Sequence, residues 1–180
     1  MTITAETTAL QLAALVSQAL ESAGVTATLS GGGAVSLYTD NEYASKDLDF
    51  VTSARRGPLA EALRPLGFTL ASDRRHFAHP ATDLFVEFPA GPLAFGDTVV
   101  AHEDVPTMQT PWGALRVITA TLCAMDRLAA FWHWNDRQSW DQAVMVVRRA
   151  DVDRSDLVSF AKQEGADGAV IDGLYENAGR

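Results

Sequence analysis

The sequence predicts a single α/β domain, in which helices flank a small mixed sheet and a C-terminal helical section follows. The first two thirds of the chain alternate short apolar runs with segments of helical periodicity, whereas the last third is almost entirely helical in pattern. With 180 residues, 47% of them apolar, the chain can bury roughly 70% of its unfolded surface in one core. We therefore expect a core over residues 1–118 and a helical section over residues 119–180, packed as one compact unit.

The chain is acidic, with 14 Lys and Arg against 23 Asp and Glu and a formal net charge of −9. This charge opposes long-range attraction to a polyphosphate backbone, so nucleic acid is disfavoured as the main ligand, although a local basic patch can still bind it. The N-terminus lacks a basic segment followed by an apolar core, and no apolar run approaches the roughly eighteen residues of a membrane span. We therefore expect a cytoplasmic protein that does not enter a membrane.

Short elements alternate through the first part of the chain. Apolar residues at helical spacing predict a packing helix over residues 5–22, which Gly24 ends. A buried strand is expected over residues 25–30, a short helix over residues 33–40 and a second strand over residues 47–52. The resulting order is strand, glycine loop, helix, strand.

The middle of the chain continues with one helix and several strands. Pro58 at a first-turn position begins a helix that Gly67 ends, and a short strand at residues 68–70 leads into a basic turn. A stronger strand signal covers residues 82–88. Two further short strands are expected within residues 99–118, separated by prolines and a glycine.

Helical periodicity dominates the last third. It predicts helices over residues 120–134 and 139–150, with a break at residues 136–138 and another helix beginning near Asp153 and Asp156. Three tryptophans lie close together here, at positions 132, 134 and 140. Such rings can stack on a base or line a groove. The alternative, preferred for Trp132 and Trp140, is a core between helices.

The most informative segment joins a glycine-rich turn to paired carboxylates. Gly31-Gly32-Gly33, preceded by Ser30, has no Cβ over three residues, so backbone N–H groups can approach a bound anion closely. Asp47 and Asp49 lie two residues apart on a predicted strand, and their side chains therefore project from one face. Two carboxylates a few ångströms apart in a partly desolvated site repel each other, and a cation offsets this repulsion. We expect Mg²⁺.

A third acid lies on the stronger predicted strand. Alternation places Phe85 and Glu87 on one face and Val86 and Phe88 on the other. Glu87 lies among apolar neighbours, where a carboxylate without a function is costly. Asp83 is the alternative third acid, but it precedes Glu87 by more than one strand repeat and lacks an apolar residue before it. Glu87 is therefore preferred.

In their order and spacing, these motifs resemble the nucleotidyltransferase superfamily related to polymerase β. Gly31-Gly32-Gly33-Ala34-Val35 and Lys46-Asp47-Leu48-Asp49-Phe50 are most similar to small bacterial nucleotidyltransferase-like proteins, including AbiEii-type toxins of toxin–antitoxin systems. The motifs cover about residues 25–90, and the helical remainder follows family precedent only loosely. Ala34 is a departure, because a serine usually follows the paired glycines.

The resemblance implies the nucleotidyltransferase fold and transfer of a nucleoside monophosphate from an NTP to a hydroxyl on RNA, protein or a small molecule. Such transfer needs charge neutralisation and alignment more than covalent help from the protein, and two metal ions about 4 Å apart provide both. The implied catalytic residues and ligands for one or two Mg²⁺ ions are Asp47, Asp49 and Glu87. Glu87 would also help to deprotonate the acceptor hydroxyl.

The resemblance also implies a set of nucleotide-binding residues. The glycines and the hydroxyl or backbone of Ser36 would contact phosphate oxygens, and two arginines from the helical section would reach the incoming phosphates. The full set is Ser30, Gly31, Gly32, Gly33, Ser36, Arg127 and Arg137. Considered from the residues alone, salt bridges to neighbouring aspartates explain the two arginines at least as well.

Positive charge is concentrated near the motif, at Arg55-Arg56, Arg64 and Arg74-Arg75. These arginines could bind an RNA acceptor such as a tRNA end. In an acidic chain, such residues are more commonly solvated surface or contacts to an acidic partner, and this interpretation is preferred.

Two other functions are compatible with the sequence. The first is a catalytically inactive protein of the same fold, serving as a nucleotide sensor or as the partner-binding component of a pair such as a toxin and its cognate antitoxin. The altered glycine turn favours it. The second is an aminoglycoside-type small-molecule nucleotidyltransferase, which predicts an acidic cleft for a cationic acceptor. Acids available for such a cleft are Glu42, Glu61, Asp73 and Asp97.

Overall fold

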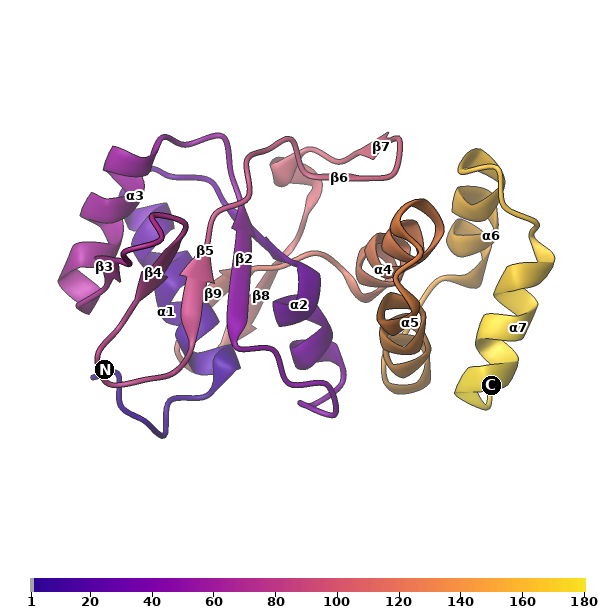
Figure 1. The fold of residues 1–180 in the computed structure, drawn as a ribbon, viewed down its shortest axis with the longest axis horizontal. Coiled ribbons are helices and arrows are strands. Elements are labelled where there is room, and N and C mark those ends of the chain that lie inside the picture. Colours follow the sequence, from indigo (N-terminus) through magenta and orange to yellow (C-terminus); the bar gives the residue numbers. More distant parts are fainter. Residues whose placement is uncertain (1) are drawn as a thin grey trace.

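The computed structural model describes residues 2–180 and contains a five-stranded mixed sheet in the order β1-β2-β5-β4-β3 (Figure 1). β2 and β5 run parallel, and every other pair of neighbours is antiparallel. The strands are β1 (Thr28–Ser30), β2 (Asp47–Val51), β3 (Thr69–Leu70), β4 (His76–Ala78) and β5 (Phe85–Glu87). The predicted α/β class with a small mixed sheet and flanking helices is confirmed.

The two faces of this sheet differ in polarity. Leu48, Phe50 and Val86 are fully buried on one face, whereas the acidic residues that alternate with them on β2 and β5 are only partly buried. The predicted alternation on β5 is correct, because Val86 is buried and Phe88 packs against Phe50 and Phe77. The apolar face thus forms the core, and the opposite face carries the carboxylates.

Helices cover the apolar face and one end of the sheet (Figure 1). They are α1 (Ala9–Ser22), α2 (Gly31–Tyr38) and α3 (Arg56–Leu63), the last continued by a 3₁₀ turn, η1 (Arg64–Leu66). α1 begins at Ala9, later than the predicted residue 5, because Thr8 and Gln11 form a capping box there. The η1 turn ends at Gly67, whose φ of 91° lies in the left-handed region.

Several short elements were not predicted. They are β4, the hairpin of β6 (Ala94–Phe95) and β7 (Thr98–Val99), and a 3₁₀ turn, η2 (His102–Asp104). Two or three residues are too few for a hydrophobic period to be visible. The two strands expected within residues 99–118 are present as the hairpin of β8 (Thr107–Thr110) and β9 (Gly113–Arg116). β9 packs on α1, and the next residue, Val117, bridges to Leu29 of β1.

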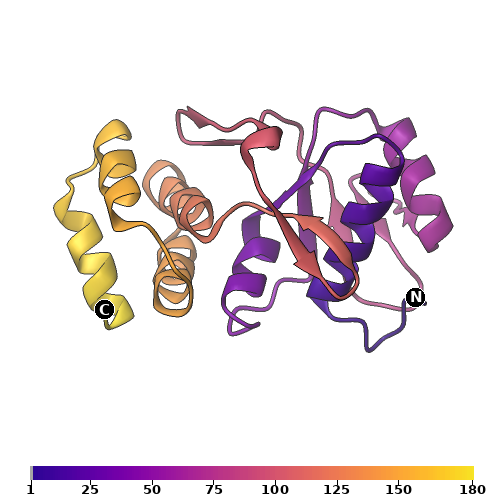
Figure 2. The same cartoon turned by 180° about the vertical axis from the view of Figure 1, so that it is seen from behind.

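The helical section lies to one side of the sheet (Figure 2). It consists of α4 (Ala120–Trp134), α5 (Arg137–Arg149), α6 (Arg154–Gln163) and α7 (Ala169–Ala178). α4 and α5 contact α2, and therefore lie between the sheet and the two last helices. α5 begins two residues earlier than predicted, since left-handed Asn135 and the N-cap Asp136 make the break. Over residues 2–180, the helices are too short or too polar to cross a membrane.

Two of the three tryptophans pack between helices, as predicted, and the third is exposed. Trp132 packs against Phe160 with ring centroids 5.9 Å apart, and Trp140 packs against Phe131 at 5.2 Å. These two rings are therefore partly buried and pack between helices against the core. Trp134, at the end of α4, is 81% exposed.

Close packing between α2 and the sheet gives a prediction for stability. A Cβ on Gly33 would lie 3.2 Å from side-chain carbons of Leu29 and Leu48, so Gly33→Val should lower the free energy of unfolding by about 1–3 kcal/mol. As a control, Gly173→Ala in α7 should leave stability unchanged or raise it, because no atom lies within 4 Å of its Cβ position. Chemical denaturation measures both. An unchanged midpoint for Gly33→Val would contradict the packing.

Candidate active site

A row of polar side chains crosses the sheet on its carboxylate face. Strand register places Ser30 of β1 opposite Asp49 of β2, Asp49 beside Glu87 of β5, and Glu87 opposite His76 of β4. Neighbouring strands lie about 4.8 Å apart. Asp47, two residues before Asp49, shares this face. The structure therefore brings together the three acids that were predicted as catalytic, although they come from two distant segments.

The glycine segment differs from the expected loop. β1 ends at Ser30 and α2 begins directly at Gly31, so the three glycines form the first turn of the helix. Gly31 has a φ of 59°, and a Cβ there would lie 2.7 Å from Oδ2 of Asp49. Only glycine fits both the backbone conformation and the space. The acid row and the helix start are thus in direct contact.

The remaining predicted residues of this segment have internal contacts. A Cβ on Gly32 would lie 2.9 Å from Oγ of Ser45. The Ser36 hydroxyl donates to the carbonyl of Gly32 at 3.0 Å and accepts from the backbone N–H of Ser45 at 2.8 Å. Ser36 is 1% exposed. This hydroxyl therefore joins α2 to the segment before β2, and the contact of the Ser36 hydroxyl or backbone with phosphate stays a prediction.

Ser45 also positions the first acid. Its hydroxyl donates a hydrogen bond to Oδ1 of Asp47. The network from Gly32 through Ser36 and Ser45 to Asp47 therefore couples the first turn of α2 to the start of β2. No sequence motif pointed to Ser45, since its contact depends on how the segment before β2 folds back on α2.

The environment of Asp49 disfavours its charge. Burial, followed by the carboxylates of Asp47 and Glu87, raises the pKa of Asp49 to about 7, although the guanidinium of Arg127 lowers it. Asp126 of α4 adds another nearby negative charge. A carboxyl group whose pKa lies near 7 in a partly buried acidic cluster is typical of a functional site that binds a cation or a proton.

Arg127 lies beside this cluster, as its effect on Asp49 shows. Its guanidinium pairs with Asp126 at 2.7 Å and donates to Gln142 of α5 at 3.1 Å, while its buried Nε has no hydrogen-bond partner among residues 2–180. The salt bridge expected from the sequence is therefore present. α4 packs on α2, which brings Asp126 and Arg127 close enough for their charges to act on Asp49.

Arg137 has a different position. It is exposed as the first residue of α5, and within residues 2–180 it makes no ion pair. The structure gives no contact that brings it to the acids. Its predicted role in phosphate binding therefore has no support from the geometry.

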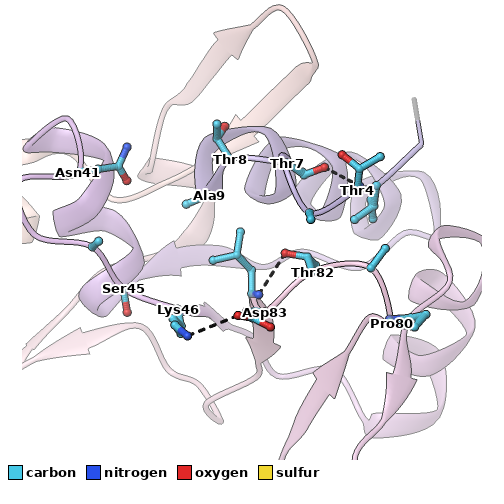
Figure 3. A pocket seen from close by; sticks show the side chains of 15 residues that line it. Thr4, Thr7, Thr8, Ala9, Asn41, Ser45, Lys46, Pro80, Thr82 and Asp83 are labelled. Carbon is cyan, nitrogen blue, oxygen red and sulfur yellow. Dashed lines mark hydrogen bonds and ion pairs between the residues drawn. The ribbon is translucent and has the colours of Figure 1, made fainter.

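The geometry also separates the two candidates for the third acid. Asp83 lies before β5, 92% exposed, and pairs with Lys46 at 3.7 Å. Figure 3 shows this pair in a cavity of about 920 Å³ between the N-terminal segment and the amino ends of β2 and β5. Glu87 instead lies beside Asp49, and its Oε2 is 3.8 Å from a guanidinium nitrogen of Arg75.

The acid row fits a divalent cation that is also held by phosphate. Carboxylate oxygens suit Mg²⁺, which proteins usually hold through one or two carboxylates together with water and substrate phosphates. In the described part of the chain, no three His, Cys, Asp or Glu side chains are close enough to hold a metal ion by themselves. The protein thus offers pairs of carboxylates beside a helix start, rather than a closed metal cage.

A second cavity lies along α4, about 330 Å³ in volume. The part of α4 that lines this cavity runs from Asp126 to Trp134, with Ala129 and Ala130 between them. The β6–β7 hairpin forms the opposite side, held by Glu164, which accepts from the backbone of Asp97 at 3.0 Å. This cavity therefore joins Asp126 to the exposed indole of Trp134.

Comparisons with known proteins add little to this geometry. The chain matches no protein-family model and is significantly similar to no curated protein. Among solved structures, it is similar to the antibiotic-resistance factor ANT(2'')-Ia, with a TM-score of 0.48 and 11% identity over 93% of this chain and 90% of that one. A similarity this distant transfers neither a substrate nor residue roles to this chain.

The raised pKa of Asp49 predicts a pH-dependent contribution to stability. The unfolded chain releases this proton near pH 3.8 and the folded protein only near pH 7. Between these values the folded state binds more protons, so the contribution of Asp49 falls as the pH rises. Asp49→Asn should therefore raise the thermal midpoint by roughly 5 °C or more at pH 8 and change it little at pH 4.

Thermal denaturation from pH 4 to pH 8, without divalent cations, measures this difference. Asp83→Asn is the matched control, because Asp83 is exposed and outside the acid row. Its midpoint should follow the wild-type profile at every pH. A constant offset between Asp49→Asn and the wild type across the range would contradict the assignment.

Proposed function

We propose that this protein is a nucleotidyltransferase that moves a nucleoside monophosphate from an NTP to an acceptor hydroxyl with the help of Mg²⁺. One observation carries the proposal: Asp49 and Glu87 lie side by side on parallel strands, with Asp47 on the same face and the glycine start of α2 against Asp49. Carboxylates for cations and backbone donors for phosphates then lie in one place, which is what this transfer requires.

The start of α2 supports triphosphate binding. The first N–H groups of a helix have no acceptor within it, and the N-cap residue Ser30 makes no side-chain hydrogen bond to them. The N–H groups of Gly31, Gly32 and Gly33 can therefore donate to phosphate oxygens, assisted by the helix dipole. The absence of side chains on these residues lets a phosphate approach the backbone.

Asp47, Asp49 and Glu87 would hold the cations, which neutralise the triphosphate and align it for attack. A cation beside Asp49 favours its ionised form and offsets the repulsion among the three carboxylates. Arg127 provides a fixed positive charge on the side of α4. The protein's residues thus bind, orient and neutralise, and they form no covalent bond to the nucleotide.

The chemical step is a displacement at the α-phosphorus. The acceptor oxygen forms a new bond to phosphorus, the bond to the bridging oxygen breaks, and pyrophosphate leaves with the bonding electron pair. Glu87 would accept the hydroxyl proton, since its carboxylate lies beside Asp49 at the side of the row away from β1. The acceptor would then approach from the side of β5 and β4.

The cavity along α4 is suited to the nucleoside. Asp126 at one end can accept hydrogen bonds from ribose hydroxyls, and Trp134 at the other offers an exposed indole for stacking on a base. The two alanines between them give the cavity an apolar part. This arrangement would place the nucleoside toward the helical section while the phosphates face α2.

A second candidate is a protein of the same fold that binds nucleotide without transferring it, as a sensor or partner-binding component. The lack of three converging metal ligands among residues 2–180 favours it. For the enzyme, the acceptor hydroxyl would belong to RNA, protein or an aminoglycoside-type small molecule, and a toxin-type role would add a cognate antitoxin. The following experiment separates transfer from binding.

Incubation with each α-³²P-labelled NTP, Mg²⁺ or Mn²⁺ and candidate acceptors should give labelled product with the wild type. Asp49→Asn should lower the rate at least 100-fold, because it removes a carboxylate from the acid row. Asp83→Asn, outside that row, is the control and should retain wild-type activity. Equal labelling by the wild type and Asp49→Asn would contradict the proposed chemistry.

Nucleotide binding is measured separately by thermal denaturation. NTP with Mg²⁺ should raise the midpoint of the wild type, since a ligand that binds only the folded state stabilises it. Asp47→Asn should remove most of this increase. Stabilisation of the wild type without any transfer would indicate the sensor function.

Trp134 provides a test of the nucleoside cavity. Trp134→Ala should weaken NTP binding about tenfold, in line with the loss of one stacking contact, and leave inorganic tripolyphosphate binding unchanged. Val99→Ala is a matched control, because Val99 is another exposed apolar side chain, on β7. Titration calorimetry measures both ligands. Equal losses for NTP and tripolyphosphate would contradict stacking at Trp134.

A further inference from the structure

We propose that the acceptor carries a phosphate group, and that a surface cavity beside Glu87 binds this group. This inference rests on the proposed function, because it names the acceptor that the acid row would serve. The cavity measures about 380 Å³ and lies between α3, the β3–β4 turn and the end of β5. Its charged lining consists of Arg56, Arg74, Arg75 and Glu87.

This cavity is positively charged, whereas the chain as a whole is negatively charged. Three arginines and one glutamate line it, whereas the whole chain has a formal net charge of −9. Arg75 lies 3.8 Å from Glu87, and neither Arg56 nor Arg74 makes an ion pair within residues 2–180. Two guanidinium groups are therefore available to an anion, and phosphate matches their geometry.

The acid that precedes Arg74 and Arg75 in the sequence, Asp73, already has partners. Asp73 accepts from the backbone N–H of Arg75 at 2.9 Å, and its other oxygen pairs with His76 at 2.6 Å. Asp73 thus shapes the turn between β3 and β4, in which Arg74 adopts a left-handed φ of 58°. The turn presents adjacent arginines to the cavity while its own carboxylate is directed to His76.

The start of α3 adds backbone donors on another side. Arg56 is the first residue of α3, and the N-cap Arg55 makes no side-chain hydrogen bond to the helix. The first N–H groups of the helix therefore lack a side-chain acceptor. Because Ala54, Arg56 and Leu59 line the cavity, this helix end borders it and also favours negative charge.

The position of the cavity assigns it to the acceptor. Glu87 belongs both to the cavity and to the acid row, so a molecule held by the arginines lies next to the residue proposed to accept its hydroxyl proton. The cavity along α4 has different lining residues, including Asp126, whose charge also acts on Asp49. Nucleoside and acceptor would then approach from different sides, as displacement requires.

This charge pattern separates acceptor classes. A phosphorylated small molecule and the backbone of RNA present the same group to the arginines. A polycationic acceptor such as an aminoglycoside would be repelled by them. The acids considered for a cationic cleft do not line this cavity, and one of them, Asp73, is engaged in the turn.

The test measures anion binding in the Asp49→Asn protein, with EDTA and without NTP, so that no metal-held triphosphate contributes. The probes are inorganic phosphate, a nucleoside monophosphate, a twelve-nucleotide RNA and kanamycin, each titrated at low salt and followed by amide NMR shifts. Phosphate-bearing probes should shift the amides of Arg56, Arg74 and Arg75. Arg56→Gln/Arg74→Gln/Arg75→Gln should weaken their binding at least tenfold.

A charge-matched variant controls for the overall loss of positive charge. Arg64→Gln/Arg154→Gln/Lys162→Gln removes three exposed charges outside the cavity, and it should bind RNA and phosphate within about twofold of its parent. Much tighter binding of RNA than of the monophosphate would assign a polymeric acceptor, and similar affinities would assign a small phosphorylated one. Both outcomes support the inference.

Two results would overturn it. One is equal weakening by the two triple variants, which would show that only net charge matters. The other is kanamycin binding that shifts the amides of Arg74 and Arg75. Failure of the proposed function is distinguishable, because the assay contains no NTP or metal and measures no transfer.

Discussion

The direct contact between Asp49 and the first turn of α2 is the constraint on which the site depends. β1 continues into α2 without a loop, and the Asp49 carboxylate lies where a side chain at position 31 would begin. The positive φ of Gly31 allows this junction. As a result, a set of backbone donors and a set of carboxylates face the same space, so an anion and its counter-cations can bind together.

The acid row is electrostatically unfavourable in isolation. Asp49 is partly buried and lies near three other carboxylates, which is why its pKa is about 7. Arg127 offsets part of this repulsion from α4, and Ser45 holds Asp47 by a hydrogen bond. Ionisable groups whose surroundings disfavour their charged form are characteristic of functional sites, because a bound ligand rather than the fold supplies the compensating charge.

Three separate parts of the chain contribute to this site. The sheet provides the acids, the helical section provides Asp126, Arg127 and the cavity that ends at Trp134, and the β3–β4 turn with α3 provides the arginines. One cavity is lined by Glu87 of the acid row and the other by Asp126, and the charges of both residues act on Asp49. Each lining suits one of the two proposed substrates. The cavity along α4 combines an indole with alanines, which suits a nucleoside, and the cavity beside Glu87 is basic, which suits a phosphorylated acceptor.

Local patterns in the sequence determined much of the fold. The order of elements through β2, the bounds of α4, the shared face of Asp47 and Asp49, and the alternation around Glu87 all depend on neighbouring residues and a fixed period. Only the tertiary structure decided which distant groups meet. It placed Glu87 rather than Asp83 beside Asp49, enclosed Ser36, left Arg137 at the surface and brought Asp126 to the acids. These outcomes depend on strand register and helix docking, which join residues far apart in the chain and therefore leave no periodic signal.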